Sequence, residues 1–504
     1  MMLLLTILIP LIAGIVLILL PLKEESHEAL ADDTKKSISF KNLCIYTGLF
    51  LILSLILLVA SVIPGDVEGY DLFKLTGPLT ISLKSDAIGR FFAVVMSVVW
   101  TCVGFFSFEY MKHEKNNKRY FGVYLMVLGI LMGLCFSGNL VTYYAFYELM
   151  TLGSFAMVLH NQSHEAVMAG LKYLFYSFAG AYMVLFGLYF VYRNSAVPAL
   201  TFTEGGIVNA GAGILNVSML LMIIGFSVKA GMFPMHGWLP TAHPVAPAPA
   251  SAALSAIIVK SGVLGIIRVI YYIFGREMFT GSYVQRVVLI LSLTTVFIGS
   301  MLAYKEKVLK KRLAYSTVSQ VSYILFGIFM MNDTAFSGSM IHVAAHAAIK
   351  STLFLCAGAI IYITGCTEVT QLRGIGKKMP IMLWCYTIVS LGLIGIPPFG
   401  GFASKWYLCI GSLDAGVPVF SWLGPVILLV SALLTAGYLL PITINGFLPG
   451  KDFCDLAAKS SDDDETYMGY MKAAEPRLMM LIPIIILTVL SVVIGLFPEV
   501  LVWA

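Results

Sequence analysis

Seven ionisable side chains lie inside apolar runs of the sequence, far from any polar loop. They are Glu148, Lys229, Lys260, His342, His346, Lys350 and Lys405. A charged side chain at the centre of a membrane helix costs about 2.5 to 3.5 kcal/mol even on the lenient insertion scale. The lysines and the glutamate of this set would together cost roughly 12 to 17 kcal/mol if they were unpaired. We therefore interpret the seven residues as groups that carry protons or other ions.

Three of these residues have a spacing that suits proton transfer. His342, His346 and Lys350 follow one another at steps of four residues in IHVAAHAAIKSTL. In a helix this spacing places them on one face, over about 12 Å. A single histidine in such a run is more often a core residue, but three titratable groups in register favour the passage of protons through intervening water.

The position of a charge within its apolar run separates a functional group from one that only reaches the lipid headgroups. Glu148 and Lys260 lie near the middle of their runs, too deep for that explanation. Four other basic residues lie closer to the ends of their runs, and we expect their long side chains to extend to the headgroups: Lys172, Arg193, Arg268 and Lys310.

Lys229 and Lys405 accompany clusters of proline and glycine that must interrupt a helix. Lys229 lies in VKAGMFPMHGWLPTAHPVAPAPASA and Lys405 in IPPFGGFASKW. Broken helices are tolerated at membrane depth only inside protein or beside water, so both lysines are expected to border hydrated cavities.

The composition excludes a water-soluble enzyme or a nucleic-acid-binding protein. Of the 504 residues, 59% are hydrophobic and 12% are charged, and the mean hydropathy is +0.90, whereas soluble domains carry about 25% charged residues. The net charge of +5 comes from basic loops, which orient membrane proteins. The eight cysteines show no CxxC or ligand spacing, so neither disulfides nor a metal site is predicted.

The apolar runs predict an all-α polytopic membrane protein with about fourteen spans. We place them near residues 11, 53, 98, 129, 150, 180, 223, 260, 293, 319, 351, 394, 433 and 489. The two interrupted segments are the seventh and twelfth spans, which cross the membrane in opposite senses and so predict two inverted repeats. The predicted division is 1–110 for spans one to three, 120–275 and 284–446 for the repeats (spans 4–8 and 9–13), 447–477 for a cytoplasmic loop, and 478–504 for the last span.

Lysine and arginine gather in alternate loops and so predict the orientation. The loops after spans one, three, nine, eleven and thirteen are basic, which places them in the cytoplasm and both termini outside. The loop from 451 to 477 also holds the acidic run Asp462, Asp463, Asp464 and Glu465, which we interpret as part of a solvated connector.

These motifs together resemble one known family. The chain is similar to the antiporter-like subunits of respiratory complex I, membrane-bound hydrogenases, formate hydrogenlyases and Mrp-type sodium/proton antiporters. The resemblance covers spans three to thirteen and rests on FYELMTLGSF around Glu148, the motifs of Lys229 and Lys405, Lys260, KRLAYSTVSQVSY and LRGIGKKMP.

The resemblance implies fourteen helices, two inverted five-helix repeats and breaks in helices seven and twelve. It also implies that Glu148 pairs with Lys229, that Lys260, His342, His346 and Lys350 form a hydrated axis, and that Lys405 lies toward the exit. At about 4 Å and an effective dielectric constant of about 20, a Glu–Lys pair is worth roughly 4 kcal/mol, enough to control whether the lysine holds its proton. The implied partners are homologous and small membrane subunits, with a peripheral redox arm or other Mrp subunits.

No cofactor is predicted in this chain, because no iron–sulfur, dinucleotide or haem motif is visible. If the chain is part of a redox enzyme complex, we expect the redox chemistry to take place in partner subunits. We expect the chain itself to lie in the cell membrane. Three alternatives stay open: a sodium-transporting subunit, a stand-alone secondary transporter and a purely structural subunit. The sequence leaves the complex, the ion and the direction of release undecided.

Overall fold

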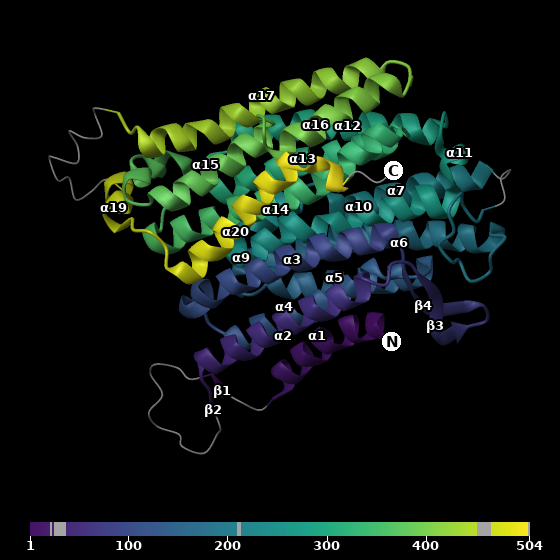
Figure 1. The fold of residues 1–504 in the computed structure, drawn as a ribbon, viewed down its shortest axis with the longest axis horizontal. Coiled ribbons are helices and arrows are strands. Elements are labelled where there is room, and N and C mark those ends of the chain that lie inside the picture. Colours follow the sequence, from purple (N-terminus) through teal and green to yellow (C-terminus); the bar gives the residue numbers. More distant parts are fainter. Residues whose placement is uncertain (21–22, 25–36, 209–212, 451–464, 502–504) are drawn as a thin grey trace. The chain divides into compact units, whose positions relative to one another are not determined.

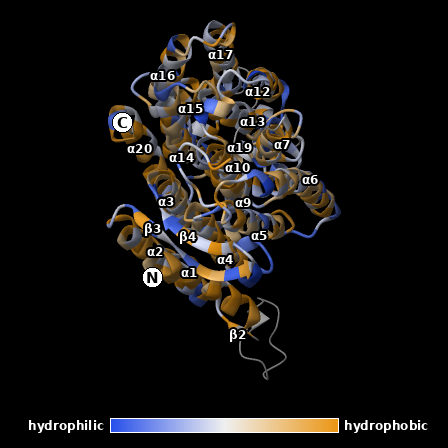
Figure 2. Cartoon of the chain, turned by 90° about the vertical axis from the view of Figure 1, so that its right-hand side faces the viewer, coloured by the Kyte–Doolittle hydropathy of each residue, from blue (hydrophilic) through white to orange (hydrophobic). Residues whose placement is uncertain are grey.

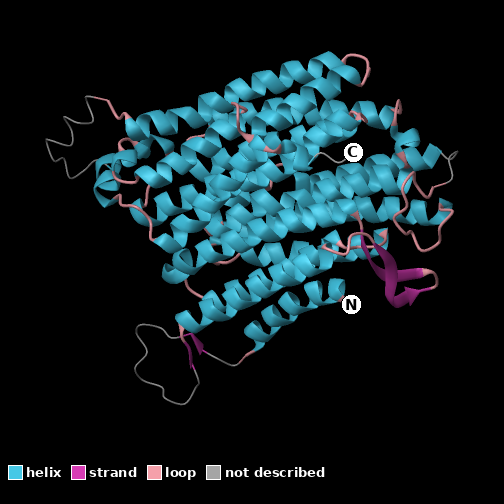
Figure 3. Cartoon of the chain, viewed as in Figure 1, coloured by secondary structure: helices cyan, strands magenta, loops and turns pink. Residues whose placement is uncertain are grey.

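The computed structural model describes residues 1–20, 23–24, 37–208, 213–450 and 465–501 (Figure 1). Most of the acidic run, Asp462, Asp463 and Asp464, lies outside the described residues. Helices dominate, as predicted, and the strands within these ranges form a hairpin and one very short pair (Figure 3). Within the described part, eleven helices are long and apolar enough to cross a membrane, or twelve if one bent pair counts as a span. The orange helices and bluer connections of Figure 2 show the same apolar character.

The all-α polytopic prediction is confirmed, whereas the count of fourteen spans and the inverted repeats stay predictions. A helix lies at each of the fourteen predicted positions. Two of these helices, α5 (Leu140–Val158) and α13 (Leu309–Phe329), are not among the eleven that are long and apolar enough to cross a membrane.

The chain folds into two compact units, and each is described by itself. Unit 1 comprises residues 1–226, 245–247 and 264–277, and unit 2 comprises residues 227–244, 248–263 and 278–504. This division differs from the predicted domains, whose boundaries stay predictions.

Unit 1 is built on helices from the first half of the chain. They are α1 (Met2–Leu19), α2 (Phe40–Val62), α3 (Ala87–Tyr110), α4 (Asn117–Cys135), α5, α6 (His164–Asn194) and most of α7 (Gly213–Ala230). The π-helical segment η3 (Arg268–Phe274) also belongs to this unit. Side-chain caps begin several of these helices: Asp86 accepts a hydrogen bond from the amide of Gly89 at 2.8 Å, and Asn139 from that of Thr142 at 2.8 Å.

An antiparallel hairpin of unit 1 was not predicted. Strands β3 (Val67–Thr76) and β4 (Leu79–Ser85) pair across a short turn at Gly77, whose φ is +53° (Figure 3). Its residues are too polar to register in a search for apolar spans. The alternation of polar and apolar residues in LTISLKS is the signal that would have found β4.

Unit 2 is assembled around one long helix, α14 (Asp333–Thr364). Its neighbours are α9 (Ala248–Ala253) with the π-helical η2 (Leu254–Ile258), α13, α15 (Pro380–Ile394), α16 (Gly400–Asp414) and α20 (Leu478–Leu496). Unit 2 also contains most of α8 (Leu239–Val245), the first part of α10 (Val259–Ile267), α12 (Tyr283–Lys305), α17 (Phe420–Phe447) and α19 (Glu465–Lys472). Every residue of α14 from Ser337 to Ile360 is buried, so any polar side chain in this stretch must find partners inside the protein.

Both predicted helix interruptions occur. Helix α7 ends at Ala230, Gly231 adopts a φ of +77°, and α8 begins only at Leu239. Helix α15 ends at Ile394, Gly395 adopts a φ of +98°, and α16 begins at Gly400. Glycine tolerates these left-handed conformations, which end a helix with little strain.

The second interruption depends on a close approach between two glycines. A Cβ atom on Gly401 of α16 would lie 1.8 Å from the carbonyl oxygen of Gly392 in α15. We therefore expect Gly401→Ala to force α15 and α16 apart and to lower the free energy of unfolding by about 1 to 3 kcal/mol. Thermal unfolding in detergent measures this. Gly213→Ala, where a Cβ meets nothing within 4 Å, is the control, and an equal loss in both variants would contradict the explanation.

Candidate functional site

The strongest candidate site is a file of buried polar side chains in unit 2. We define the Lys–His file as Lys260, His346, His342, Ser404, Tyr323 and Lys405. Helix α10 supplies Lys260, α14 the histidines, α13 Tyr323, and α16 Ser404 and Lys405. All six are buried, with exposures from 0% to 9%.

One end of the file is a direct contact between two titratable groups. The Nζ atom of Lys260 lies 2.5 Å from Nδ1 of His346. Only one proton fits between two nitrogens at this distance, so either the ammonium donates to a neutral imidazole or the imidazole donates to a neutral amine. Two charges this close would repel by roughly 7 kcal/mol at an effective dielectric constant of about 20. Lys260 and His346 therefore share the proton between their nitrogens and carry at most one positive charge.

The two histidines connect this pair to α16. Their ring centroids are 5.8 Å apart. His342 uses Nδ1 to contact the hydroxyl of Ser404 at 2.8 Å, and its ring stacks on Tyr323 at a centroid distance of 5.7 Å. The Ser404 hydroxyl also reaches the carbonyl oxygen of Gly401 at 3.1 Å. A hydroxyl can accept one proton and donate another, so Ser404 can pass a proton on.

Lys405 closes the file at the second helix interruption. Its Nζ atom donates to the carbonyl oxygens of Leu393 at 2.6 Å and Ile394 at 2.8 Å, the last residues of α15, and lies 5.2 Å from the centroid of the Tyr323 ring. The carboxyl end of a helix and the face of an aromatic ring both attract a cation. The Lys405 side chain therefore satisfies two helix-terminal carbonyls.

Lys350 is buried on α14 and has a backbone partner on α13. Its Nζ atom donates to the carbonyl oxygen of Leu313 on α13 at 3.1 Å. The predicted row of His342, His346 and Lys350 thus lies on one buried helix, with a different partner for each side chain.

The remaining two predicted residues, Lys229 and Glu148, belong to different units. Lys229 is in the last turn of α7, fully buried in unit 2, with Nζ 6.0 Å from the centroid of the Trp238 ring. Trp238 donates through Nε1 to the carbonyl oxygen of Val228 at 2.8 Å, which satisfies the end of α7. Glu148 is half-buried on α5 in unit 1. The expected pairing of Glu148 with Lys229 stays a prediction.

Both histidines of the file, and His243 of α8, have buried ring nitrogens without hydrogen bonds among the described residues. Nε2 of His342 and Nε2 of His346 have no partner among the described residues, and the same holds for both ring nitrogens of His243 in α8. Leaving such a group dry costs about 1 to 3 kcal/mol. His243 stacks on Phe354, one turn beyond Lys350, at a centroid distance of 4.8 Å. Sequence reasoning passed over His243, although it lies within the motif of Lys229.

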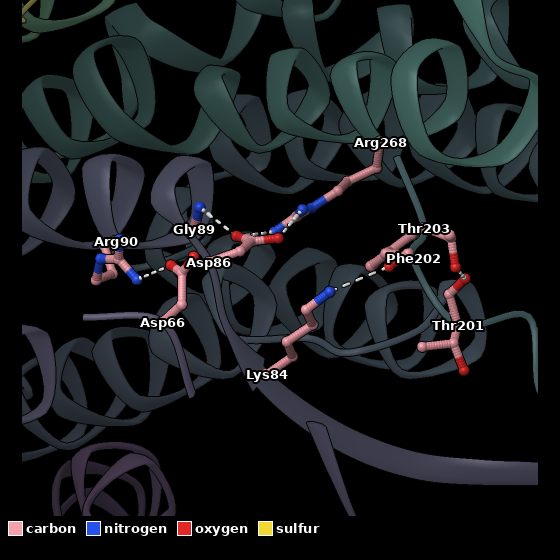
Figure 4. Close-up of polar contacts among 9 residues, drawn as sticks. All are labelled: Asp66, Lys84, Asp86, Gly89, Arg90, Thr201, Phe202, Thr203 and Arg268. Atoms are coloured by element: carbon pink, nitrogen blue, oxygen red, sulfur yellow. Dashed lines mark hydrogen bonds and ion pairs between the residues drawn. The ribbon is translucent and has the colours of Figure 1, made fainter. Parts of the chain in front are cut away.

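An ion-pair cluster in unit 1 was also missed, and it corrects the prediction for Arg268 (Figure 4). Arg268 was expected to reach the headgroups, yet it is 1% exposed and forms a two-pronged contact with the carboxylate of Asp86. Its guanidinium also lies 4.9 Å from the Phe202 ring and 4.8 Å from the Tyr272 ring. Lys310, expected to behave likewise, is 6% exposed. A charged side chain that finds a partner inside the protein does not need to extend to the lipid headgroups.

The cluster extends on both sides of Asp86. Figure 4 shows Arg90 paired with Asp66, and Lys84 donating to the carbonyl oxygen of Phe202 at 3.3 Å. Asp86 meanwhile holds the first turn of α3 through Gly89. The cluster thus links the start of α3 to η3 within unit 1. The segment η3 continues the helical stretch that carries Lys260.

The comparisons with known proteins identify the family. The profile of the NADH:quinone oxidoreductase/Mrp antiporter transmembrane family matches residues 137–435, and that of the complex I chain 5 N-terminus matches residues 75–121. The chain belongs to this NADH:quinone oxidoreductase/Mrp antiporter family, as the sequence motifs predicted.

Relatives of both kinds occur among curated proteins. The chain is 28% identical to an NADH-quinone oxidoreductase subunit of Desulforudis audaxviator over 88% of this chain and 87% of that protein. It is 27% identical to a Na(+)/H(+) antiporter subunit of Alkalihalophilus pseudofirmus over 72% of this chain and 73% of that protein.

Solved structures show the same fold. A chain of the Mrp complex from Dietzia sp. superposes with a TM-score of 0.80 at 22% identity, covering 99% of this chain and 95% of that one. A chain of respiratory complex I from Thermus thermophilus superposes with a TM-score of 0.78 at 20% identity, covering 99% and 96%.

The buried Asp86–Arg268 pair predicts an acid-sensitive contribution to stability. Burial raises the pKa of the Asp86 carboxyl, but the charge and hydrogen bonds of Arg268 outweigh it and bring the pKa below its ordinary value. Because the folded pKa is depressed, the stabilisation is present above the unfolded pKa of about 3.9 and is lost as the pH falls through the folded value.

We expect Asp86→Asn to lower the free energy of unfolding at neutral pH by about 3 to 5 kcal/mol, because it leaves Arg268 buried without its counter-charge. Melting temperatures in detergent, measured across pH, should show this difference shrinking below about pH 4. A difference that stays constant down to pH 2 would contradict the assignment.

Proposed function

We propose that this chain is a proton-translocating, antiporter-like subunit of a multi-subunit membrane complex. The observation that carries the proposal is the Lys–His file, in which polar side chains from four helices of unit 2 lie close to one another inside the protein. The family membership supports it, because the matched relatives include subunits of NADH-quinone oxidoreductase and of sodium/proton antiporters.

The proposed transfer begins at the shared proton. An ammonium at Lys260 donates its proton to Nδ1 of His346, which releases a proton from Nε2 toward His342. His342 passes a proton from Nδ1 to the hydroxyl of Ser404, which gives its own proton onward to Lys405. Lys405 accepts this proton as a neutral amine and then releases one. Once Lys260 has been loaded again, each residue has received one proton and released one, and the file is back at its starting charge. Lys229, paired with Glu148, and Lys350 are proposed to load the file.

Partner subunits supply the driving force in this proposal. The matched structures are chains of an Mrp complex and of respiratory complex I, so neighbouring membrane subunits are the expected partners, with redox chemistry in a peripheral arm. The described residues contain no group of three or more His, Cys, Asp or Glu side chains placed to hold a metal ion. We place the chain in the cell membrane with both termini outside.

A subunit that exchanges sodium for protons is the second candidate, favoured by the relative from Alkalihalophilus pseudofirmus. Sodium would need several oxygen ligands. The Lys–His file presents mainly nitrogen atoms, which favours protons as the ion that moves along it. Sodium uptake that persists with a protonophore present, in vesicles containing the complex, would favour the second candidate.

Removal of the shared proton site should stop translocation without preventing assembly. We expect Lys260→Ala and His346→Ala to lower the proton flux of the purified complex in vesicles by about tenfold or more. A pH-sensitive dye inside the vesicles measures the flux. Lys172→Ala, which removes an exposed lysine from α6, is the control. Wild-type flux in both file variants would overturn the proposal.

Lys405 offers a test that separates proton transfer from structural support. Lys405→Arg keeps a donor for the carbonyl oxygens of Leu393 and Ile394, but a guanidinium does not release its proton. We expect this variant to retain the thermal stability of the complex and to lose most of its proton flux. Lys405→Ala should lose both, because two helix-terminal carbonyls lose their donor. Normal flux in Lys405→Arg would exclude Lys405 as a carrier.

A further inference from the structure

Gln320 on α13 is a fully buried amide that makes none of its hydrogen bonds within the described part of the chain. Its exposure is 0%, and neither Oε1 nor Nε2 has a partner among the described residues. Gln285 on α12 is equally enclosed but satisfied: its Nε2 donates to the carbonyl oxygen of Phe329 at 2.8 Å, and its Oε1 accepts from the amide of Gly281 at 2.8 Å. Buried polar groups are almost always paired, so Gln320 requires an explanation that Gln285 does not.

The contacts of α13 show which way Gln320 faces. Thr317, three residues before it, contacts Ser255 of η2 at 2.6 Å, and Tyr323, three residues after it, stacks on His342 of α14. Residues three apart share a helix face, so Gln320 lies on the face turned toward η2 and α14.

The contacts between α13 and α14 show which residues of α14 lie opposite Gln320. Lys350 contacts the carbonyl oxygen of Leu313, and Ser339 contacts that of Ile324 at 3.0 Å, so the two helices run in opposite directions. Gln320 therefore stands opposite the part of α14 that carries His342 and His346.

The unpaired atoms of the two histidines are at this same level. Both rings use Nδ1 for a fixed partner, Lys260 for His346 and Ser404 for His342. Both leave Nε2 buried and without a partner among the described residues. Between the two imidazole rings, therefore, no hydrogen bond among the described residues links the Nε2 atom of His346 to that of His342.

We infer that Gln320 is a positioning residue that holds water between His346 and His342. This inference rests on the proposed function. The amide oxygen accepts a hydrogen bond from such a water and the amide nitrogen donates one, so the side chain orients water without taking up a proton. A proton leaves Nε2 of His346, passes through the water and arrives on Nε2 of His342. Bridging waters of this kind need two to four polar partners, which Gln320 and the two rings provide.

Replacing Gln320 with an apolar side chain of similar length tests this. We expect Gln320→Met to lower the proton flux of the reconstituted complex by about tenfold or more, because the water loses its anchor. Its melting temperature should be unchanged or raised, since an amide without protein hydrogen bonds among the described residues is removed. Gln285→Met is the matched control: it should lower the melting temperature and leave the flux per folded complex unchanged.

A conservative variant adds a readout that a structural role would not move. Gln320→Glu keeps an oxygen that can hold water, so we expect flux well above that of Gln320→Met, with a new dependence on pH as the carboxyl titrates. Normal flux in Gln320→Met would overturn the inference, as would a fall in melting temperature to match that of Gln285→Met. If Lys260→Ala and His346→Ala also translocate normally, the proposed function fails; if only Gln320→Met does, the inference alone fails.

Discussion

The contact between Lys260 and His346 is the constraint on which the rest of the buried site depends. At 2.5 Å in a low-dielectric interior the two groups cannot both be charged, so the pair carries at most one positive charge, with one proton between the two nitrogens. This contact requires that α10 and α14 be packed closely and that α14 be enclosed on every side. The burial of all residues from Ser337 to Ile360 meets that requirement. A lysine and a histidine facing lipid would separate and reach for the headgroups instead.

Both helix interruptions expose backbone carbonyls inside the protein, and the one between α15 and α16 does so at the Lys–His file. At the end of α15 the carbonyl oxygens of Leu393 and Ile394 accept from Lys405, and at the end of α7 that of Val228 accepts from Trp238. An unbroken helix would have used these oxygens internally. The interruptions differ in which side chain satisfies the carbonyls, a cation in one and an indole in the other. The Lys405 side chain is therefore held in place by the backbone itself.

Much of this organisation could be predicted from the sequence, because membrane burial makes charge expensive and proline and glycine visible. The apolar helices, both interruptions and the burial of Lys260, His342, His346, Lys350 and Lys405 followed from those two facts, whereas the burial of Lys310 and of His243 did not. Partners could not be predicted, since the spacing of His342, His346 and Lys350 gives their shared face but not what each side chain meets across it. Arg268 shows the same limit: its depth was visible, but Asp86, distant in the sequence, was not. The hairpin β3–β4 was missed because it is neither apolar nor helical.

The contrast between the two buried polar clusters explains why only one is suited to moving a charge. In unit 1 both carboxylate oxygens of Asp86 are held, by Arg268 and by the amide of Gly89, and neither arginine nor carboxylate has reason to change partner. Such a network fixes the geometry of helix ends. In unit 2 each histidine of the file has one committed nitrogen and one uncommitted nitrogen among the described residues, so a proton can enter by one route and leave by the other. A proton path needs this incomplete pairing, because a fully satisfied chain of hydrogen bonds would hold its protons in place.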